Sequence, residues 1–337
     1  MTAEEKIAAI MRFDRGRIAV VGDLMLDVYL WGNVTRISPE APVPVVNVKK
    51  RTFCLGGAGN VMRNISTLGG KALAFGAVGD DASGREVLSG LGEYGIAADG
   101  VVSAGTRRTT EKCRIVAGAQ QLLRADFEET APLDDALRAR MVEQIFALIA
   151  DGKIDAVIFD DYAKGVLSAW MLEKIIAAAQ AKGIITLLDP KPKAGGVTPV
   201  AGLTVLKPNR SEAFALAGIN DDNFSGAPED NRLLQKAAEK ISEAWRPEYL
   251  LISLASQGMA LFQGGELRQV IPTRAREVFD VSGAGDTVAA SCALALATGC
   301  DAASAAEIAN FAAGVVVGKI GTAPVFRDEL LTAIRQN

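Results

Sequence analysis

Short runs of apolar residues alternate with longer amphipathic stretches along most of this chain. The apolar runs have the length of buried strands and span residues 17–22, 72–78, 156–159, 184–188, 204–206 and 249–253. Stretches with apolar residues at helical spacing lie between most of them, at 133–150, 168–182 and 231–244. This alternation predicts an α/β protein with a mostly parallel central sheet and helices on both faces. Functional sites in such sheets gather at the carboxyl ends of the strands.

Two segments, 28–50 and 109–126, lack the helical pattern. The first contains three prolines and a short stretch at 43–48 that is typical of a strand. The second has a pattern that also predicts strands. We expect the two segments to form a small sheet that projects from the main domain, although hairpins packed on the core fit the sequence nearly as well. No internal repeat, low-complexity tract or linker is visible, so the prediction is a single domain over residues 1–337.

Composition limits the class of protein. The chain has 337 residues, of which 49% are hydrophobic and 23% charged, so it can bury a large core. A net charge of −4 predicts neither nucleic-acid nor anionic-membrane binding. The four cysteines form no CxxC pair, residues 1–17 lack the apolar core of a signal peptide, and no apolar run reaches a membrane-spanning length. We therefore expect a cytoplasmic protein.

The chain contains no histidine. This excludes Ser-His-Asp triads, Cys-His pairs and histidine-ligated metals within the chain. Acid–base chemistry is left to Asp, Glu, Lys, Tyr or Cys. Magnesium, which prefers oxygen ligands, suits this inventory best.

The string F-D-V-S-G-A-G-D-T at 279–287 precedes a run of small residues and predicts a glycine-rich turn that opens a buried helix. Gly283 and Gly285 would let a ligand approach the backbone N–H groups, which at a helix N-terminus favour a phosphate. Asp286 would repel a phosphate that merely docked there, but it suits a general base for an attacking hydroxyl. The pattern favours a kinase. A glycine cap followed by a solvated Asp is the simpler interpretation.

Two more motifs suit a sugar. Asp23 and Asp27 follow the first predicted strand, and a carboxylate such as that of Asp27 can accept two hydroxyl donors. A helix or turn cap would explain Asp27 as well. Gly56 and Gly57 would let a polyhydroxy substrate approach the backbone, with Asn60 both donating and accepting hydrogen bonds.

These strings resemble the two signatures of the PfkB/ribokinase family of sugar kinases, with Val281 where the family often has Thr. The resemblance implies a ribokinase-like fold whose small projecting sheet forms a lid over the sugar. An exposed small sheet with apolar residues also favours pairing with a second copy, so we expect a homodimer. The resemblance also implies that Asp286 is the catalytic base and that the amides of Gly283, Ala284 and Gly285 stabilise the transferred phosphoryl group. Asp23, Asp27, Gly56, Gly57 and Asn60 would then hold the acceptor.

Residues 207–212 resemble the family's N-x-x-E element, and residues 253–258 resemble its T-L-G-x-x-G nucleotide loop. The resemblance implies ATP with Mg²⁺, Glu212 holding the metal through water, and leaves monovalent-cation dependence open. The implied nucleotide-binding residues are Asn209, Glu212, Ser253, Gly258 and Asn310. A helix cap would explain Asn209 and Glu212 equally well, and core packing would explain the helix around Asn310.

Longer strings at 21–27, 36–45, 161–165, 189–191 and 314–322 resemble the D-glycero-β-D-manno-heptose-7-phosphate kinases of lipopolysaccharide core synthesis. The resemblance implies phosphorylation of O1 to give the 1,7-bisphosphate, on the route to ADP-heptose. In many bacteria this kinase is fused to a nucleotidyltransferase domain whose H-x-G-H motif needs histidine. The sequence therefore predicts the stand-alone kinase.

The phosphate already on such a substrate needs cations. The candidates, which the sequence does not rank, are Lys164, Lys191, Lys193, Arg36 and Arg63. Three other functions stay open: another kinase of the family acting on ribose, fructose, fructose 6-phosphate or a nucleoside, a non-catalytic sugar- or nucleotide-binding protein, and an NAD-dependent oxidoreductase. The last is disfavoured because 56–64 lacks the G-x-G-x-x-G spacing.

Overall fold

The computed structural model describes residues 1–118, 120–192, 196, 198–275 and 277–336. Within these residues the main sheet has nine strands in the order β13-β12-β11-β10-β9-β8-β1-β4-β5, and all pairs from β11 to β5 are parallel. The antiparallel strands β12 and β13 complete one edge. The nine strands are β1 (Arg17–Gly22), β4 (Lys71–Val78), β5 (Ala97–Ser103), β8 (Ala156–Asp160), β9 (Ile185–Asp189), β10 (Val205–Leu206), β11 (Tyr249–Ser253), β12 (Met259–Gln263) and β13 (Glu266–Ile271).

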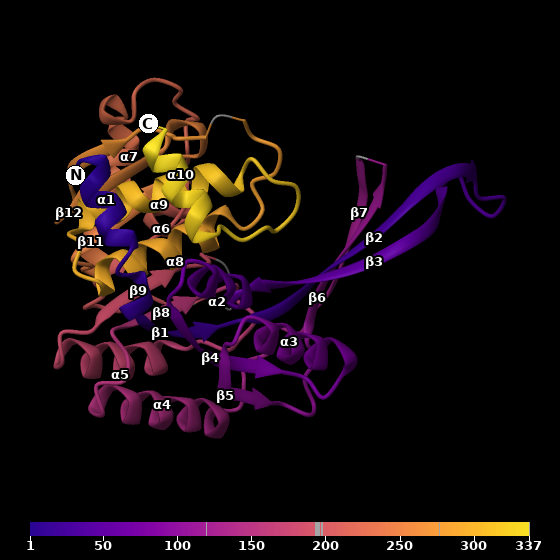
Figure 1. Ribbon diagram of the computed structural model, residues 1–337, viewed down its shortest axis with the longest axis horizontal. Helices are drawn as coiled ribbons and strands as arrows, with labels where there is room; N and C mark the ends of the chain where they lie inside the picture. The colour runs from indigo at the N-terminus through magenta and orange to yellow at the C-terminus, as the bar shows by residue number, and fades with distance from the viewer. Residues whose placement is uncertain (119, 193–195, 197, 276, 337) are drawn as a thin grey trace.

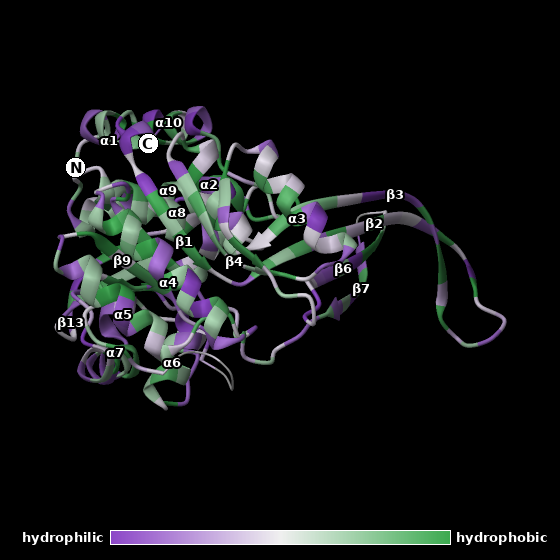
Figure 2. Cartoon of the chain, turned by 90° about the horizontal axis from the view of Figure 1, so that it is seen from below, coloured by the Kyte–Doolittle hydropathy of each residue, from purple (hydrophilic) through white to green (hydrophobic). Residues whose placement is uncertain are grey.

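Helices cover both faces of this sheet (Figures 1 and 2). Successive side chains of a strand point alternately into two hydrophobic cores, one on each face. In β1, Ile18 and Val20 belong to one core, whereas Ala19 and Val21 belong to the other. The first core is covered by α1 (Ala3–Ile10), α2 (Ala58–Thr67), α3 (Ala82–Glu93), α8 (Ala284–Ala297), α9 (Ala302–Val316) and α10 (Arg327–Arg335). The second core is covered by α4 (Asp135–Ala150), α5 (Ala169–Gln180), α6 (Arg210–Ala217) and α7 (Arg232–Trp245).

The elements predicted from hydrophobic periodicity are confirmed, because each predicted run falls on a strand or helix whose ends differ by a few residues at most. Side-chain caps explain several of the helix starts. Ser168, Asn231 and Asp301 each accept a hydrogen bond from the backbone N–H three residues later, at the beginning of α5, α7 and α9. The predicted fold class, an α/β protein with a mostly parallel sheet between helices, is therefore correct.

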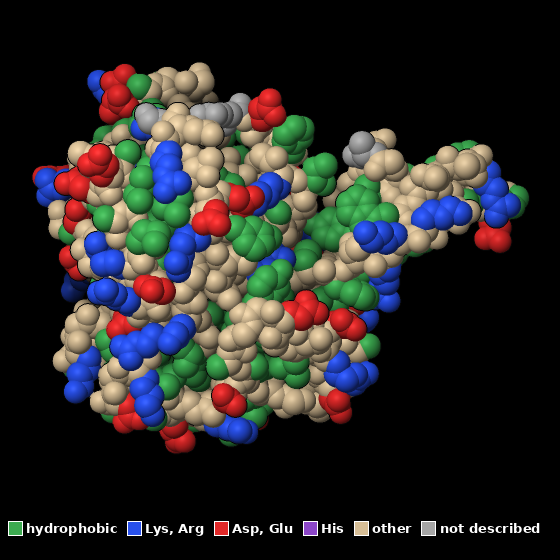
Figure 3. Space-filling view, in the orientation of Figure 1, with side chains coloured by type: hydrophobic (Ala, Val, Ile, Leu, Met, Phe, Trp, Pro, Cys, Tyr) green, Lys and Arg blue, Asp and Glu red, His purple; other side chains and the backbone are tan. Residues whose placement is uncertain are grey.

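A second sheet projects from the main body (Figure 1). Its order is β3-β2-β6-β7, with β2 antiparallel to β3 and parallel to β6. The strands are β2 (Leu24–Ile37), β3 (Pro44–Gly57), β6 (Thr110–Ala117) and β7 (Gln120–Phe127). The predicted projecting sheet is confirmed, and β2 begins earlier than expected, directly after Asp23. Phe53, Leu123 and Phe127 are exposed on this sheet. Figure 3 shows apolar side chains on one face of the projecting part of the molecule.

No helix in the described part of the chain combines the length and apolar character needed to cross a bilayer.

The close approach of β1 and β8 requires a glycine at position 22. A Cβ atom there would lie 2.3 Å from the carbonyl oxygen of Asp160. We predict that Gly22→Ala lowers the free energy of unfolding by about 1–3 kcal/mol, because the two strands must move apart. Gly92→Ala in α3 is the control, since a Cβ there meets no atom within 4 Å. Urea unfolding midpoints would test this, and equal midpoints for Gly22→Ala and wild type would contradict it.

Candidate active site

The site is centred on the N-terminus of α8. Gly283 caps this helix with φ 79°, a left-handed conformation that favours glycine. A Cβ atom at this position would also lie 2.7 Å from Nδ2 of Asn60. The helix is buried from Asp286 to Ala295, because alanines and other small side chains let it pack closely between α2, α9 and the sheet. A carboxylate in the first turn of α8 is thereby held inside the protein.

Asp286 is fixed by two donors from different elements. Nδ2 of Asn60 in α2 donates to Oδ2 at 2.7 Å, and the Tyr162 hydroxyl in the loop after β8 donates to Oδ1 at 2.9 Å. Burial raises the pKa of Asp286, and the hydrogen bonds from Asn60 and Tyr162 oppose that rise. The carboxylate is therefore rigidly held and more basic than an exposed Asp.

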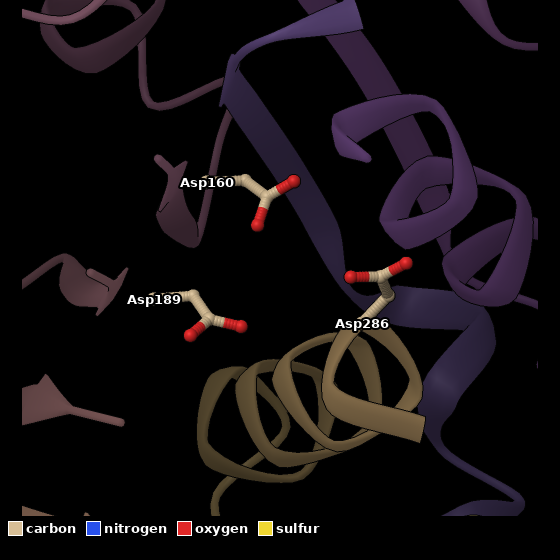
Figure 4. A group of neighbouring side chains, drawn as sticks. All are labelled: Asp160, Asp189 and Asp286. Carbon is tan, nitrogen blue, oxygen red and sulfur yellow. The ribbon is translucent and has the colours of Figure 1, made fainter. Parts of the chain in front are cut away.

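Two further carboxylates lie beside Asp286 at the carboxyl ends of β8 and β9. Asp160, Asp189 and Asp286 each place one carboxylate oxygen within 4.8 Å of the others, and Figure 4 shows the three groups facing a shared space. Among the described residues, neither carboxylate oxygen of Asp160 has a hydrogen-bond partner. Burial, followed by the charges of Asp286 and Asp189, raises the pKa of Asp160 well above its usual range. Oxygen ligands and unmatched negative charge fit a divalent cation such as Mg²⁺.

Lys207 supplies the positive charge nearest to this cluster. Its Nζ lies 2.8 Å from Oδ2 of Asp189, and its side chain is almost completely buried. A Cβ atom at Gly285 would lie 3.6 Å from this Nζ and 3.7 Å from the Asp189 oxygen. The ammonium therefore lies against the first turn of α8, where the backbone N–H groups also favour an anion.

A cavity of about 810 Å³ opens beside the N-terminus of α8. Its lining includes the glycines of the turn and all the residues expected to bind the nucleotide, namely Asn209, Glu212, Ser253, Gly258 and Asn310. Asn209 caps α6 in a reciprocal capping box with Glu212, so the simpler interpretation of this pair is correct as far as the local structure goes. Both residues nevertheless line the cavity. Asn310 donates to the carbonyl oxygen of Pro272 at 2.6 Å.

The residues expected to bind the sugar lie on the other side of Asp286. Gly56 and Gly57 end β3 and lead into α2, which carries Asn60. The Asp27 carboxylate in β2 is close to Gly56, since a Cβ there would lie 2.9 Å from its Oδ2. Asp27 also accepts hydrogen bonds from Arg114 at 2.6 Å and from Thr322 at 3.1 Å.

Asp23 and Arg63 contact the residues around the expected sugar site. The buried Asp23 carboxylate accepts hydrogen bonds from the backbone N–H groups of Tyr162, Lys164 and Val166, so its contacts shape the loop after β8. Arg63 Nη2 donates to Oδ1 of Asn60 and to the carbonyl oxygen of Thr322, both at 2.6 Å. These two residues orient their neighbours and do not line the cavity.

Among the described residues, the cations expected near a sugar phosphate are not brought together. Lys164 forms an ion pair with Glu128, and Lys191 Nζ lies 2.7 Å from Oε1 of Glu212 on the nucleotide side. Arg36 lies near the tip of the β2–β3 ribbon, away from α8 (Figure 1). Lys193 lies outside the described residues.

Four site residues were missed from the sequence: Asp160, Tyr162, Asp189 and Lys207. The sequence does place all four where site residues are expected, because each of them ends a parallel strand or follows it within two residues. The strings 161–165 and 189–191 resemble those of the heptose kinases, but only their lysines were assigned a role in the site. A search for polar residues at every strand end would have found all four.

Comparison with known proteins identifies the family. The family model of pfkB carbohydrate kinases matches residues 15–328. The chain belongs to the pfkB family of carbohydrate kinases. It is therefore a sugar phosphotransferase, which confirms the kinase chemistry expected from the glycine-rich turn.

Curated relatives agree with this assignment, and solved structures share the fold. The chain is 43% identical over 325 residues to the bifunctional protein HldE of Pelobacter propionicus and 42% identical over 330 residues to that of a Caulobacter species. These alignments cover 96% and 97% of this chain, which spans only 64% and 65% of those relatives. The fold is similar to Escherichia coli phosphofructokinase-2, with TM-score 0.74, 20% identity and coverage of 95% and 98% of the two chains. Arabidopsis thaliana ribokinase gives TM-score 0.68 at 20% identity, covering 95% of this chain and 99% of that one.

The contacts of Asp286 predict how its pKa responds to Tyr162→Phe. Because the Tyr162 hydroxyl stabilises the charged carboxylate, its removal should raise the pKa of Asp286 further. Carboxyl ¹³C NMR of Asp-labelled protein, with Asp286→Asn to assign the resonance, would measure the shift. Tyr94→Phe, in a tyrosine at the end of α3, is the control. A pKa that stays constant or falls in Tyr162→Phe would contradict the prediction.

Proposed function

We propose that this protein transfers the γ-phosphoryl group of ATP to O1 of D-glycero-β-D-manno-heptose 7-phosphate, giving the 1,7-bisphosphate used for ADP-heptose. The observation that carries the transfer chemistry is the buried Asp286 carboxylate, held by Asn60 and Tyr162 between the cavity and the second sheet. The heptose phosphate is supported by the branch-specific strings and by the identity to the HldE proteins.

Asp286 would act as the general base that takes the proton from the attacking hydroxyl. Its raised pKa keeps it basic, while the two hydrogen bonds fix the carboxylate for in-line approach of the acceptor. A base of this kind contributes roughly 10²–10⁴ in rate.

The negative charge that develops on the transferred phosphoryl group would be stabilised from the nucleotide side of Asp286. The N–H groups of Gly283, Ala284 and Gly285 at the start of α8 would bind the phosphoryl oxygens, and Lys207 would add a buried positive charge. Asp160 and Asp189 are the residues that would hold Mg²⁺, with Glu212 further along the cavity. When bound, Mg²⁺ would neutralise the phosphate oxygens of ATP.

The second sheet would close over the sugar. Gly56 and Gly57 let the acceptor approach the backbone, and Asp27 and Asn60 offer oxygens for its hydroxyl groups. Excluding water from this space would suppress hydrolysis of ATP. The exposed apolar residues Phe53, Leu123 and Phe127 support pairing of this sheet with a second copy of the chain.

The proposal is tested by ADP release from purified protein with Mg-ATP and a panel of acceptors. The panel is D-glycero-D-manno-heptose 7-phosphate, fructose 6-phosphate, fructose, ribose and adenosine. We expect kcat/KM to be highest with the heptose phosphate and the product to be a bisphosphate. Preference for another acceptor would overturn the substrate but keep the phosphotransfer chemistry, and no turnover with any of them would support a binding protein.

Asp286→Asn should lower kcat by roughly 10²–10⁴, because the amide cannot take the proton. Affinity for ATP, measured by calorimetry, should stay close to that of the wild type. Asp99→Asn is the matched control, since Asp99 is exposed on β5 at the far edge of the sheet. A kcat near the wild-type value in Asp286→Asn would remove Asp286 as the base.

A further inference from the structure

Lys112 is a cation in the second sheet that the proposed reaction does not yet use. It lies in β6 opposite Asp27 of β2 and Asp126 of β7. Directly paired residues point to the same face of a sheet, so Lys112 shares the face of the Asp27 carboxylate. Its neighbour Cys113 points the other way, into the hydrophobic core beneath α2 and α3.

The Lys112 ammonium reaches the acceptor side of the catalytic carboxylate. Its Nζ lies 4.7 Å from the centroid of the Tyr162 ring, and the hydroxyl of the same ring donates to Asp286 at 2.9 Å. The charges of Asp27 and Asp286 both act on Lys112. The ammonium therefore borders the space between Asp27 and Asp286 where the sugar would lie.

In the described part of the chain, no ion pair joins Lys112 to a carboxylate. Among the described residues, the ion pairs near the site join Arg114 to Asp27, Lys164 to Glu128 and Lys207 to Asp189, and none includes Lys112. The side chain is half-buried, and burial lowers the pKa of Lys112, while Asp27 opposes that effect. A partly desolvated ammonium with three donors, which lies over an aromatic ring and forms no ion pair among the described residues, is suited to bind an anion.

We propose that Lys112 binds a phosphate monoester on the acceptor sugar and so makes the enzyme select a phosphorylated acceptor. This inference rests on the proposed sugar-kinase function and names the residue that reads the substrate's own phosphate. The phosphates of ATP are the other anions at hand, but the described lining of the 810 Å³ cavity does not include Lys112. The second sheet places this lysine on the side of Asp286 that faces away from the cavity, where the sugar would lie.

The experiment compares kcat/KM for phosphorylated and free acceptors in wild type, Lys112→Met and Lys112→Arg. The pairs are heptose 7-phosphate with heptose, fructose 6-phosphate with fructose, and ribose 5-phosphate with ribose. We expect Lys112→Met to lose about 10- to 150-fold with the phosphorylated acceptor, as for a hydrogen bond between charged groups, and to change little with its free partner. Lys112→Arg keeps the charge and should retain most of the preference.

Lys50→Met is the matched control, because Lys50 lies on the same face of the sheet, opposite Trp31, and is exposed further from α8. Thermal unfolding of Lys112→Met would show that the variant is folded. An equal loss with both acceptors, mainly in kcat, would mean that Lys112 serves phosphoryl transfer or Asp286, and would overturn the inference. An unchanged preference in Lys112→Met would overturn it as well.

The same measurements test the heptose assignment and the role of Lys112 separately. A wild type that prefers fructose 6-phosphate or ribose 5-phosphate to heptose 7-phosphate would overturn the heptose assignment, and Lys112 would then be judged on the preferred pair. A wild type that uses every free sugar better than its phosphate would overturn the role of Lys112 while leaving the kinase chemistry intact.

Discussion

Three carboxylates buried within a few ångströms of one another are the constraint on which the rest of this site depends. Asp160, Asp189 and Asp286 repel one another, and burial makes their charged forms still more costly. The protein tolerates them because Lys207 pairs with Asp189, and because Asn60 and Tyr162 donate to Asp286. The remaining negative charge is what a metal–nucleotide complex would neutralise, so the electrostatic strain of the free protein favours binding of the co-substrate.

Rigid elements hold these groups in place. The ends of β8 and β9 fix Asp160 and Asp189, and the buried start of α8 fixes Asp286. Asp23 ties the loop after β8 to the end of β1 through three backbone hydrogen bonds, which sets the position of Tyr162. Residues outside direct reach of a ligand thus determine the geometry of the residues within it.

The two sheets contribute to different parts of the site. The main sheet and α6 line the cavity proposed to accept the nucleotide, whereas β2, β3 and β6 carry the groups proposed to face the acceptor. The Asp27–Arg114 pair, with Thr322 bound to the same carboxylate, joins the second sheet to the segment after α9. Asp286, the proposed base, lies between the two compartments, where a phosphoryl group would pass from one to the other.

The sequence by itself determined the alternating strands and helices, the strand character of the second sheet and the turn that carries Asp286, because each depends on local periodicity or on glycine geometry near one place in the chain. It left open whether the second sheet projects or packs on the core. It also indicated Asn60, Asn209 and Glu212 through short motifs. Only the tertiary structure decided that Tyr162 donates to Asp286, that Lys207 pairs with Asp189 and that Lys112 lies over the Tyr162 ring. These relations join residues far apart in sequence, so they depend on strand order and register, which no local pattern encodes.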